Sequence, residues 1–127
     1  MLGSRRRLRV LIVEDDGAAR ETLAELVKFL GHDPWPSADG KEALARAEHE
    51  LPDVGLVDIG LPDMHGNDVA QALRRGARGR ELRLIALTGN SDPAERLVTL
   101  AAGFDDHVVK PVSLERLRSL LTEETRT

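Results

Sequence analysis

The chain contains no cysteine and very few aromatic residues, and both gaps exclude whole classes of function. Without a thiol among its 127 residues, it has no disulfides, no thiolate metal site and no cysteine nucleophile. Aromatic residues make up only 2% of the chain, so it lacks the stacking platforms that bind single-stranded nucleic acid. The core must therefore be built from leucine, valine, isoleucine and alanine.

Long apolar runs and a strong charge of one sign are missing as well. No run approaches the length of a membrane span, and the N-terminus lacks the apolar core of a signal peptide, so we expect a cytoplasmic protein. The net charge of −4 gives no global attraction to DNA, and we expect neither a nucleic-acid nor a membrane partner. Arg5, Arg6, Arg7 and Arg9 are interpreted as a solvated basic lead-in.

The length and the balance of residues favour one globular domain. Apolar residues make up 41% of the chain and charged residues 31%, which is typical of a globular protein with a single core. We expect this domain over residues 8–122, between a basic tail at 1–7 and a C-terminal tail at 123–127. No output domain is expected to follow, and the oligomeric state is expected to be a monomer or a weak dimer.

Strand and helix patterns alternate five times along the chain. Continuous apolar runs at 10–13, 54–57, 84–87 and 108–109 are typical of strands that are covered on both faces of a parallel sheet. The segment 33–37 contains Pro34 and Pro36, so it is predicted at a sheet edge. Helical spacing follows each strand. The pattern predicts an α/β fold with a doubly wound, five-stranded parallel sheet and five helices. If the strand order is 2-1-3-4-5, as in flavodoxin-like proteins, the first and third strands are neighbours.

Polar residues stand directly after four of the predicted strands. Glu14 and Asp15 follow the first strand, Asp58 follows the third, Thr88 the fourth and Lys110 the fifth. The carboxyl ends of parallel strands lie at one edge of the sheet, where open α/β sheets bind their ligands. These five side chains are therefore predicted to share one site.

The residue types at this edge point to a cation and a phosphoryl group. Three neighbouring carboxylates either raise a pKa or recruit a cation, and an all-oxygen set favours Mg²⁺. Asp58 is the candidate nucleophile, because carboxylates can form aspartyl-phosphate intermediates. Lys110 can pair with Asp58 or with a phosphoryl oxygen, and the Thr88 hydroxyl can donate to another phosphoryl oxygen.

The chain resembles the receiver domain of two-component response regulators from about Val10 to Leu121. The matching motifs are VLIVEDD at 10–16, VDIGLPDMHG at 57–66, LTG at 87–89 and GFDDHVVKP at 103–111. Each motif is a weak signal alone, but their order and spacing together are highly specific. The resemblance implies a receiver fold over residues 8–122.

The resemblance also implies roles for the site residues. Asp58 would accept a phosphoryl group from a sensor histidine kinase or a histidine phosphotransfer protein. Mg²⁺ would be bound by Asp15, Asp58 and the backbone carbonyl of Gly60, with Glu14 acting mostly through water. The protein would be a phosphorelay switch that assists its own phosphorylation and dephosphorylation, and not an enzyme.

Thr88 and Lys110 would bind the phosphoryl group in such a switch. Movement of Thr88 would reposition the face formed by the fourth helix, the fifth strand and the fifth helix, where a downstream partner binds. His107 stands where the family usually has Tyr or Phe, and our hypothesis is a rotamer switch with a pH-sensitive charge. The alternative is a half-exposed histidine on an edge strand. Gly89 should leave room for the phosphodonor. Gly60 should leave attacking water less obstructed, which predicts a phosphoryl group that is not unusually long-lived.

Five further polar residues are given structural roles. Asp16 is predicted to cap the first helix. Asp63 and His65 belong to the turn after the third strand, where turn geometry and solvation explain them. Asp105 and Asp106 are interpreted as solvated turn charges.

Three other functions are considered. A phosphatase of the haloacid-dehalogenase type needs an acid two residues after the nucleophile, where this chain has Gly60. A flavodoxin-like FMN carrier needs a phosphate loop after the first strand, where Glu14 and Asp15 would repel phosphate. A receiver-like module that takes no phosphate and only binds partners is the third alternative.

Overall fold

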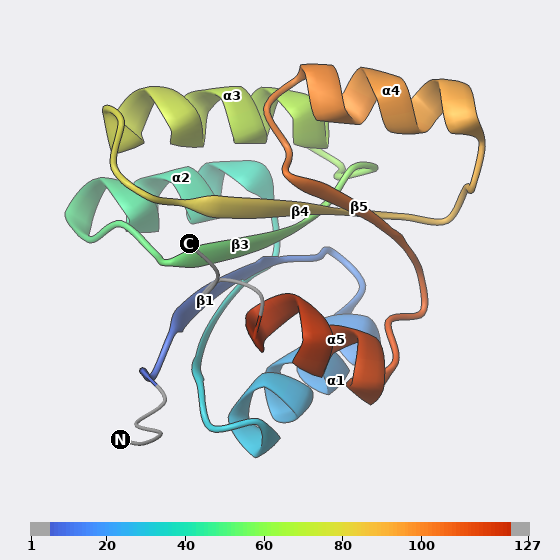
Figure 1. Ribbon diagram of the computed structural model, residues 1–127. Helices are drawn as coiled ribbons and strands as arrows, with labels where there is room; N and C mark the ends of the chain where they lie inside the picture. Colours follow the sequence, from blue (N-terminus) through green and yellow to red (C-terminus); the bar gives the residue numbers. More distant parts are fainter. Residues whose placement is uncertain (1–5, 123–127) are drawn as a thin grey trace.

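The computed structural model describes residues 6–122 and alternates strand and helix five times, as predicted (Figure 1). The elements are β1 (Arg9–Val13), α1 (Gly17–Phe29), β2 (Asp33–Ser37), α2 (Gly40–His49), β3 (Val54–Asp58), α3 (Gly66–Ala77), β4 (Arg83–Thr88), α4 (Pro93–Ala101), β5 (Asp106–Val109) and α5 (Leu114–Thr122). No helix within residues 6–122 has both the length and the apolar character that a membrane span requires.

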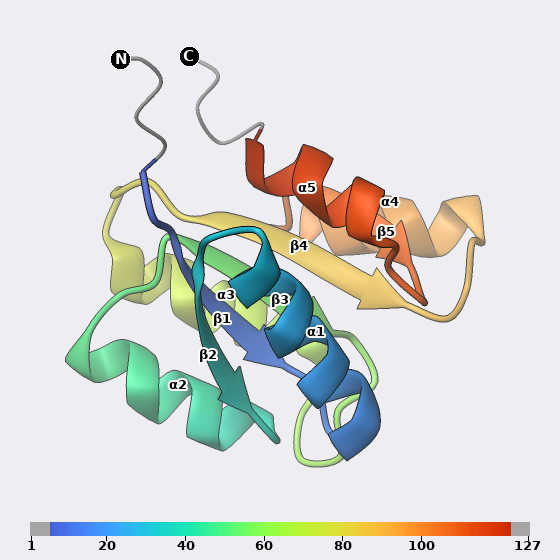
Figure 2. The same ribbon diagram turned by 90° about the horizontal axis from the view of Figure 1, so that it is seen from below.

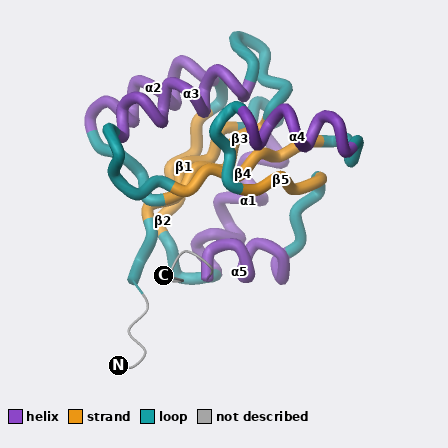
Figure 3. The backbone as a smooth tube through the Cα atoms, turned by 45° about the horizontal axis from the view of Figure 1, so that its top comes forward, coloured by secondary structure: helices purple, strands orange, loops and turns teal. Residues whose placement is uncertain are grey.

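All strand pairs are parallel, and the sheet order is β2-β1-β3-β4-β5, so the predicted fold class is confirmed. The helices cover both faces. Figure 1 shows α2, α3 and α4 on one side of the sheet and α1 and α5 on the other. In Figure 2 the pair α1 and α5 lies in front of the strands, and in Figure 3 the strands form a single layer between helices.

The two helix layers explain why the central strands β1, β3 and β4 contain continuous apolar runs. Leu11 and Val13 of β1 pack in the core under α2 and α3, whereas Val10 and Ile12 pack in the core under α1 and α5. Successive side chains of a strand point to opposite faces, so a sheet covered on both sides buries them all. Each buried side chain of this size stabilises the fold by roughly 1.5–3 kcal/mol.

The strand with two prolines, β2, lies at the sheet edge, as predicted. The Asp33 N–H donates to the carbonyl of Leu8, and the Ser37 carbonyl accepts a bond from the loop after β1. Alternate residues of a strand direct their hydrogen-bonding groups to opposite sides. Pro34 and Pro36 therefore face outward, where a missing N–H breaks no bond of the sheet.

Polar side chains begin the helices. The prediction for Asp16 is confirmed, because its carboxylate accepts from the N–H of Ala19 at the start of α1. His65 is more than a solvated turn residue. Its Nδ1 accepts from the N–H of Asn67 at 3.0 Å and caps α3.

Asp105 is exposed in the turn before β5, as predicted, but Asp106 already belongs to β5, and neither carboxylate is merely solvated. The Asp105 carboxylate accepts from the N–H of Leu84 at 2.8 Å and pairs with Arg74 at 2.6 Å. Asp106 pairs with Arg83 at 2.5 Å. The two aspartates therefore tie the start of β5 to α3 and to β4.

The basic lead-in also binds the domain where the structure describes it. Arg9 pairs with Asp53 at 3.1 Å and with Glu50 at 2.6 Å, and Arg6 pairs with Asp53 at 3.3 Å. Burial opposes ionisation of Asp53, but hydrogen bonds from Arg9 outweigh it and hold the pKa of Asp53 below its usual value. Arg6 and Arg9 are thus not merely solvated, and Arg5 lies outside the described residues.

Candidate functional site

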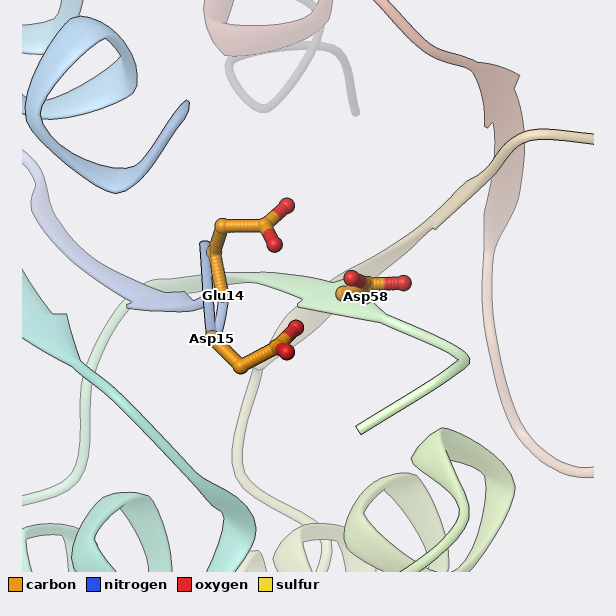
Figure 4. A group of neighbouring side chains, drawn as sticks. All are labelled: Glu14, Asp15 and Asp58. Carbon is orange, nitrogen blue, oxygen red and sulfur yellow. The ribbon is translucent and has the colours of Figure 1, made fainter. Parts of the chain in front are cut away.

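Four of the predicted site residues converge at the carboxyl ends of the strands. Glu14 and Asp15 follow β1, Asp58 ends β3 and Lys110 follows β5. One carboxylate oxygen from each of Glu14, Asp15 and Asp58 lies within 4.8 Å of the other two. Figure 4 shows the side chains of Glu14 and Asp15 turned toward Asp58. The strand order makes this possible, because β1 and β3 are neighbours.

Lys110 bridges the two buried carboxylates of this cluster. Its Nζ lies 3.1 Å from Asp58 Oδ2 and 3.4 Å from Glu14 Oε1. Burial disfavours the charge of Lys110, but the hydrogen bond to Asp58 and the two carboxylate charges outweigh it and raise the pKa of Lys110. The ammonium is thus held protonated against Asp58. The peptide bond between Lys110 and Pro111 is cis.

Two of the three carboxylates in the acidic cluster are buried. Glu14 is 1% exposed and Asp58 is 6% exposed, whereas Asp15 is open to solvent. Burial raises the pKa of Glu14, and the charge of Asp58 acts in the same direction. The cluster holds three carboxylates, and within the described chain one ammonium, that of Lys110, contacts two of them. Their oxygens form a donor set that fits a hard divalent cation.

Arg20 of α1 binds the backbone of the loop that carries Glu14 and Asp15, a role that the sequence did not reveal. Its Nη1 donates to the backbone carbonyl of Glu14 at 2.9 Å and reaches that of Asp15 at 3.4 Å. The Glu14 carboxylate also accepts from the N–H of Asp16 at 3.1 Å. These bonds fix the loop that presents the first two carboxylates.

The loop after β3 is anchored at both ends. Asp58 Oδ1 accepts from the N–H of Gly60 at 3.0 Å. Farther along, the Asp63 carboxylate accepts from the N–H groups of Gly40 and Lys41 at 3.0 and 2.9 Å. These backbone bonds lower the pKa of Asp63. The role of Asp63 is therefore to tie this loop to the start of α2, and not only to shape a turn.

Thr88 ends β4 beside the cluster, but its hydroxyl bonds elsewhere. Thr88 Oγ1 donates to Glu95 Oε1 at 2.9 Å and accepts from the N–H of Asn90 at 3.1 Å. Glu95 lies in the first turn of α4 and was not singled out in the sequence. The structure thus joins the Thr88 hydroxyl to α4 and not to the side chain of Asp58 or Lys110, although the Thr88 carbonyl accepts from the backbone N–H of Lys110.

His107 of β5 is buried near Glu95 of α4. It is 6% exposed, which contradicts the alternative of a half-exposed histidine. Its Nε2 has no hydrogen-bond partner among the described residues, and the carboxylate oxygen Glu95 Oε1 lies 4.0 Å away. Burial lowers the pKa of His107, with Arg96 acting in the same direction and Glu95 against it. The ring is therefore neutral at physiological pH.

Gly60 and Gly89 leave open space beside the site. A Cβ built on Gly60 would meet no described atom nearer than Asp58 Oδ1, at 3.9 Å. A Cβ on Gly89 would meet nothing within 4 Å. Neither residue has a positive φ. A Cβ can therefore be added at both positions without distorting the backbone.

The chain matches a known protein family along most of its length. The family model of the response regulator receiver domain matches residues 10–122. The response regulator MprA of Mycolicibacterium vanbaalenii is 36% identical over 122 residues, covering 93% of this chain and 52% of that protein. MprA of Mycobacterium avium is also 36% identical and is covered to 51%. The chain thus spans about half the length of these curated relatives.

Solved structures match over nearly their whole length. A CheY-like response regulator receiver domain protein from Methanospirillum hungatei is 30% identical with a TM-score of 0.82, covering 95% of this chain and 98% of the other. The chemotaxis protein CheY4 of Vibrio cholerae is 28% identical with a TM-score of 0.86, covering 93% and 98%. This chain belongs to the response regulator receiver domain family of two-component systems.

Proposed function

We propose that this receiver domain accepts a phosphoryl group on Asp58 from a histidine kinase or a histidine phosphotransfer protein. The observation that carries the proposal is the contact between Asp58 and Lys110 inside a cluster of three carboxylates. A buried aspartate with a lysine at 3.1 Å has both a nucleophilic oxygen and a positive group ready for phosphoryl oxygens.

In the transfer, an Asp58 carboxylate oxygen attacks phosphorus and forms the P–O bond of an acyl phosphate. The P–N bond of the donor phosphohistidine breaks, and its electron pair leaves with the imidazole. Catalysis of such a step is mostly positioning and electrostatic stabilisation. Lys110 supplies a fixed positive charge, and the Gly60 N–H holds the Asp58 carboxylate in place. Hydrolysis reverses the switch: water attacks phosphorus beside Gly60, which carries no side chain, and the P–O bond to Asp58 breaks. Inorganic phosphate leaves, and the Asp58 carboxylate is restored.

The donor set fits Mg²⁺ as the cofactor. Asp15, Asp58 and the carbonyl of Gly60 would bind the ion directly. Glu14 would interact with it mostly through metal-bound water. When bound, Mg²⁺ offsets the negative charge of the cluster and of the phosphoryl oxygens. Arg20 keeps the loop that carries Glu14 and Asp15 in place for that role.

Phosphorylation is proposed to change the binding of a protein partner at the face formed by α4, β5 and α5. Four large apolar side chains are exposed in the described chain, and three of them lie on α4 and β5. They are Leu97, Val98 and Val109, at 69%, 58% and 41% exposure. Exposed apolar side chains that gather on one face are typical of protein-binding surfaces. A protein partner is therefore the expected reader of the phosphorylated state.

The test is incubation with acetyl phosphate and Mg²⁺, followed by intact mass measurement. We expect the wild type to gain one phosphoryl group and Asp58→Asn to gain none. Asp68→Asn, an exposed position in the first turn of α3, serves as the matched control and should gain the group as the wild type does. Chelation of the metal should prevent the gain. A wild type that stays unmodified would point instead to a receiver-like module that only binds partners.

A further inference from the structure

A single carboxylate oxygen lies between two groups that the switch is expected to couple. Glu95 Oε1 accepts the Thr88 hydroxyl at 2.9 Å and lies 4.0 Å from His107 Nε2. Thr88 ends β4, Glu95 begins α4 and His107 lies in β5. The oxygen therefore stands at the junction of three elements, two of which form the proposed output face.

His107 Nε2 is short of a partner in this arrangement. It is buried, and it makes no hydrogen bond within residues 6–122. A buried polar atom without a partner costs free energy, so an acceptor that became available nearby would be taken. Of the charged groups around this ring, Arg96 cannot accept a hydrogen bond, whereas Glu95 can.

We propose that Glu95 is a positioning residue whose Oε1 exchanges Thr88 for His107 when Asp58 is phosphorylated. This inference rests on the proposed function and extends it from the phosphorylation site to α4. A threonine hydroxyl has one hydrogen to donate, so Thr88 cannot serve Glu95 and a phosphoryl oxygen at once. When the hydroxyl turns to the phosphoryl group, Glu95 loses that donor and the Nε2–H of His107 takes its place.

The distances show that the exchange needs only a small movement, which brings the start of α4 closer to β5. A hydrogen bond from nitrogen to oxygen spans about 2.7–3.2 Å, so Glu95 Oε1 and His107 Nε2 must approach by roughly 1 Å. Glu95 belongs to α4 and His107 to β5, so their approach draws the first turn of α4 toward β5. Arg96 Nη1 already reaches the carbonyl of His107 at 3.5 Å and lies in the same turn.

The test observes the His107 imidazole directly by NMR in the full chain labelled with ¹⁵N-histidine. The chain has four histidines, and His107→Gln identifies the signal by its loss. Spectra are recorded at neutral pH, where the lowered pKa keeps the His107 ring neutral. In the wild type, acetyl phosphate with Mg²⁺ is expected to shift the Nε2 signal downfield, as a new hydrogen bond requires.

Three variants separate the exchange from a general effect on the fold. Glu95→Ala should lose the shift while still gaining a phosphoryl group, and Glu95→Gln should restore part of it because the amide oxygen can accept. Thr88→Ala should show the shifted signal without acetyl phosphate, because Glu95 is released from the start. Glu115→Ala removes an acidic residue from the first turn of α5 and should behave as the wild type.

The outcomes distinguish this inference from the proposed function. A wild type that gains no phosphoryl group overturns the phosphorylation proposal, whereas Thr88→Ala tests the exchange without any phosphoryl group. An unshifted His107 signal in Thr88→Ala overturns the exchange. So does a Glu95→Ala variant whose signal shifts on phosphorylation as the wild-type signal does.

Discussion

Gly66→Ala is expected to destabilise the protein by about 2 kcal/mol, because a side chain at the start of α3 would run into main-chain atoms at the end of β3. A Cβ on Gly66 would lie 2.6 Å from the Cα of Ile59 and 2.7 Å from the carbonyl oxygen of Asp58. Both atoms belong to the backbone, which cannot swing aside as a flexible side chain does.

The magnitude follows from two opposing terms. Overpacking costs about 1–3 kcal/mol, and a clash with two main-chain atoms belongs at the upper end of that range. Replacing glycine by alanine restricts the unfolded chain and returns about 0.4–1 kcal/mol. The difference of about 2 kcal/mol lowers the melting temperature of a domain of this size by roughly 6–10 °C. Thermal unfolding followed by far-UV circular dichroism measures it.

Gly89→Ala is the matched control, because its Cβ would meet no described atom within 4 Å and its φ is not positive. We expect Gly89→Ala to melt at the wild-type temperature or slightly above it. The reasoning is refuted if Gly66→Ala melts with the wild type, or if both variants lose stability equally. Phosphorylation of Gly66→Ala should also slow, since the displaced atoms belong to Asp58 and Ile59.

Two further predictions concern the site. Gly60→Leu should slow hydrolysis of the phosphoryl group severalfold, because a Cβ there meets no described atom nearer than 3.9 Å and the rest of the side chain would shield phosphorus from water. Decay of the phosphorylated mass after donor removal measures this, and an unchanged decay would contradict it. For His107, which faces Glu95 and Arg96 of α4, the folded protein holds the pKa below the usual value of about 6.5. The unfolded chain therefore binds the proton first, so the free energy of unfolding should decrease as pH falls below about 6.5 and level off below the folded pKa. Urea titrations should show a flatter pH dependence in His107→Gln; parallel curves for the two proteins would argue against a buried neutral ring.

The fold could be predicted because its signals are local. An apolar run and the polar residue after it are neighbours in the sequence, so the strand ends at Asp58 and Thr88 could be located without a structure. The edge position of β2 followed from Pro34 and Pro36 for the same reason. Parallel strands then place these ends together, which is why the acidic cluster could be anticipated.

The contacts that the sequence did not reveal are long-range or made by long side chains. Arg20 reaches back from α1 to two carbonyls, and nothing in its helical spacing marks that direction. Asp63 bonds to a helix start more than twenty residues away. In the sequence, Glu95 is an ordinary acidic residue in the first turn of a helix, where its negative charge interacts favourably with the helix dipole. Its bond to Thr88 depends on where α4 packs, which no local pattern fixes.

The outward prolines of β2 also bear on how the protein behaves at high concentration. An exposed strand edge is a template on which a second copy of a chain can pair, and such pairing is a common route to aggregation. Pro34 and Pro36 present no N–H on that edge, so an added strand would find two of its acceptors without donors. The sheet is thereby protected against growth at β2, so the protein is expected to resist strand-to-strand aggregation on that side.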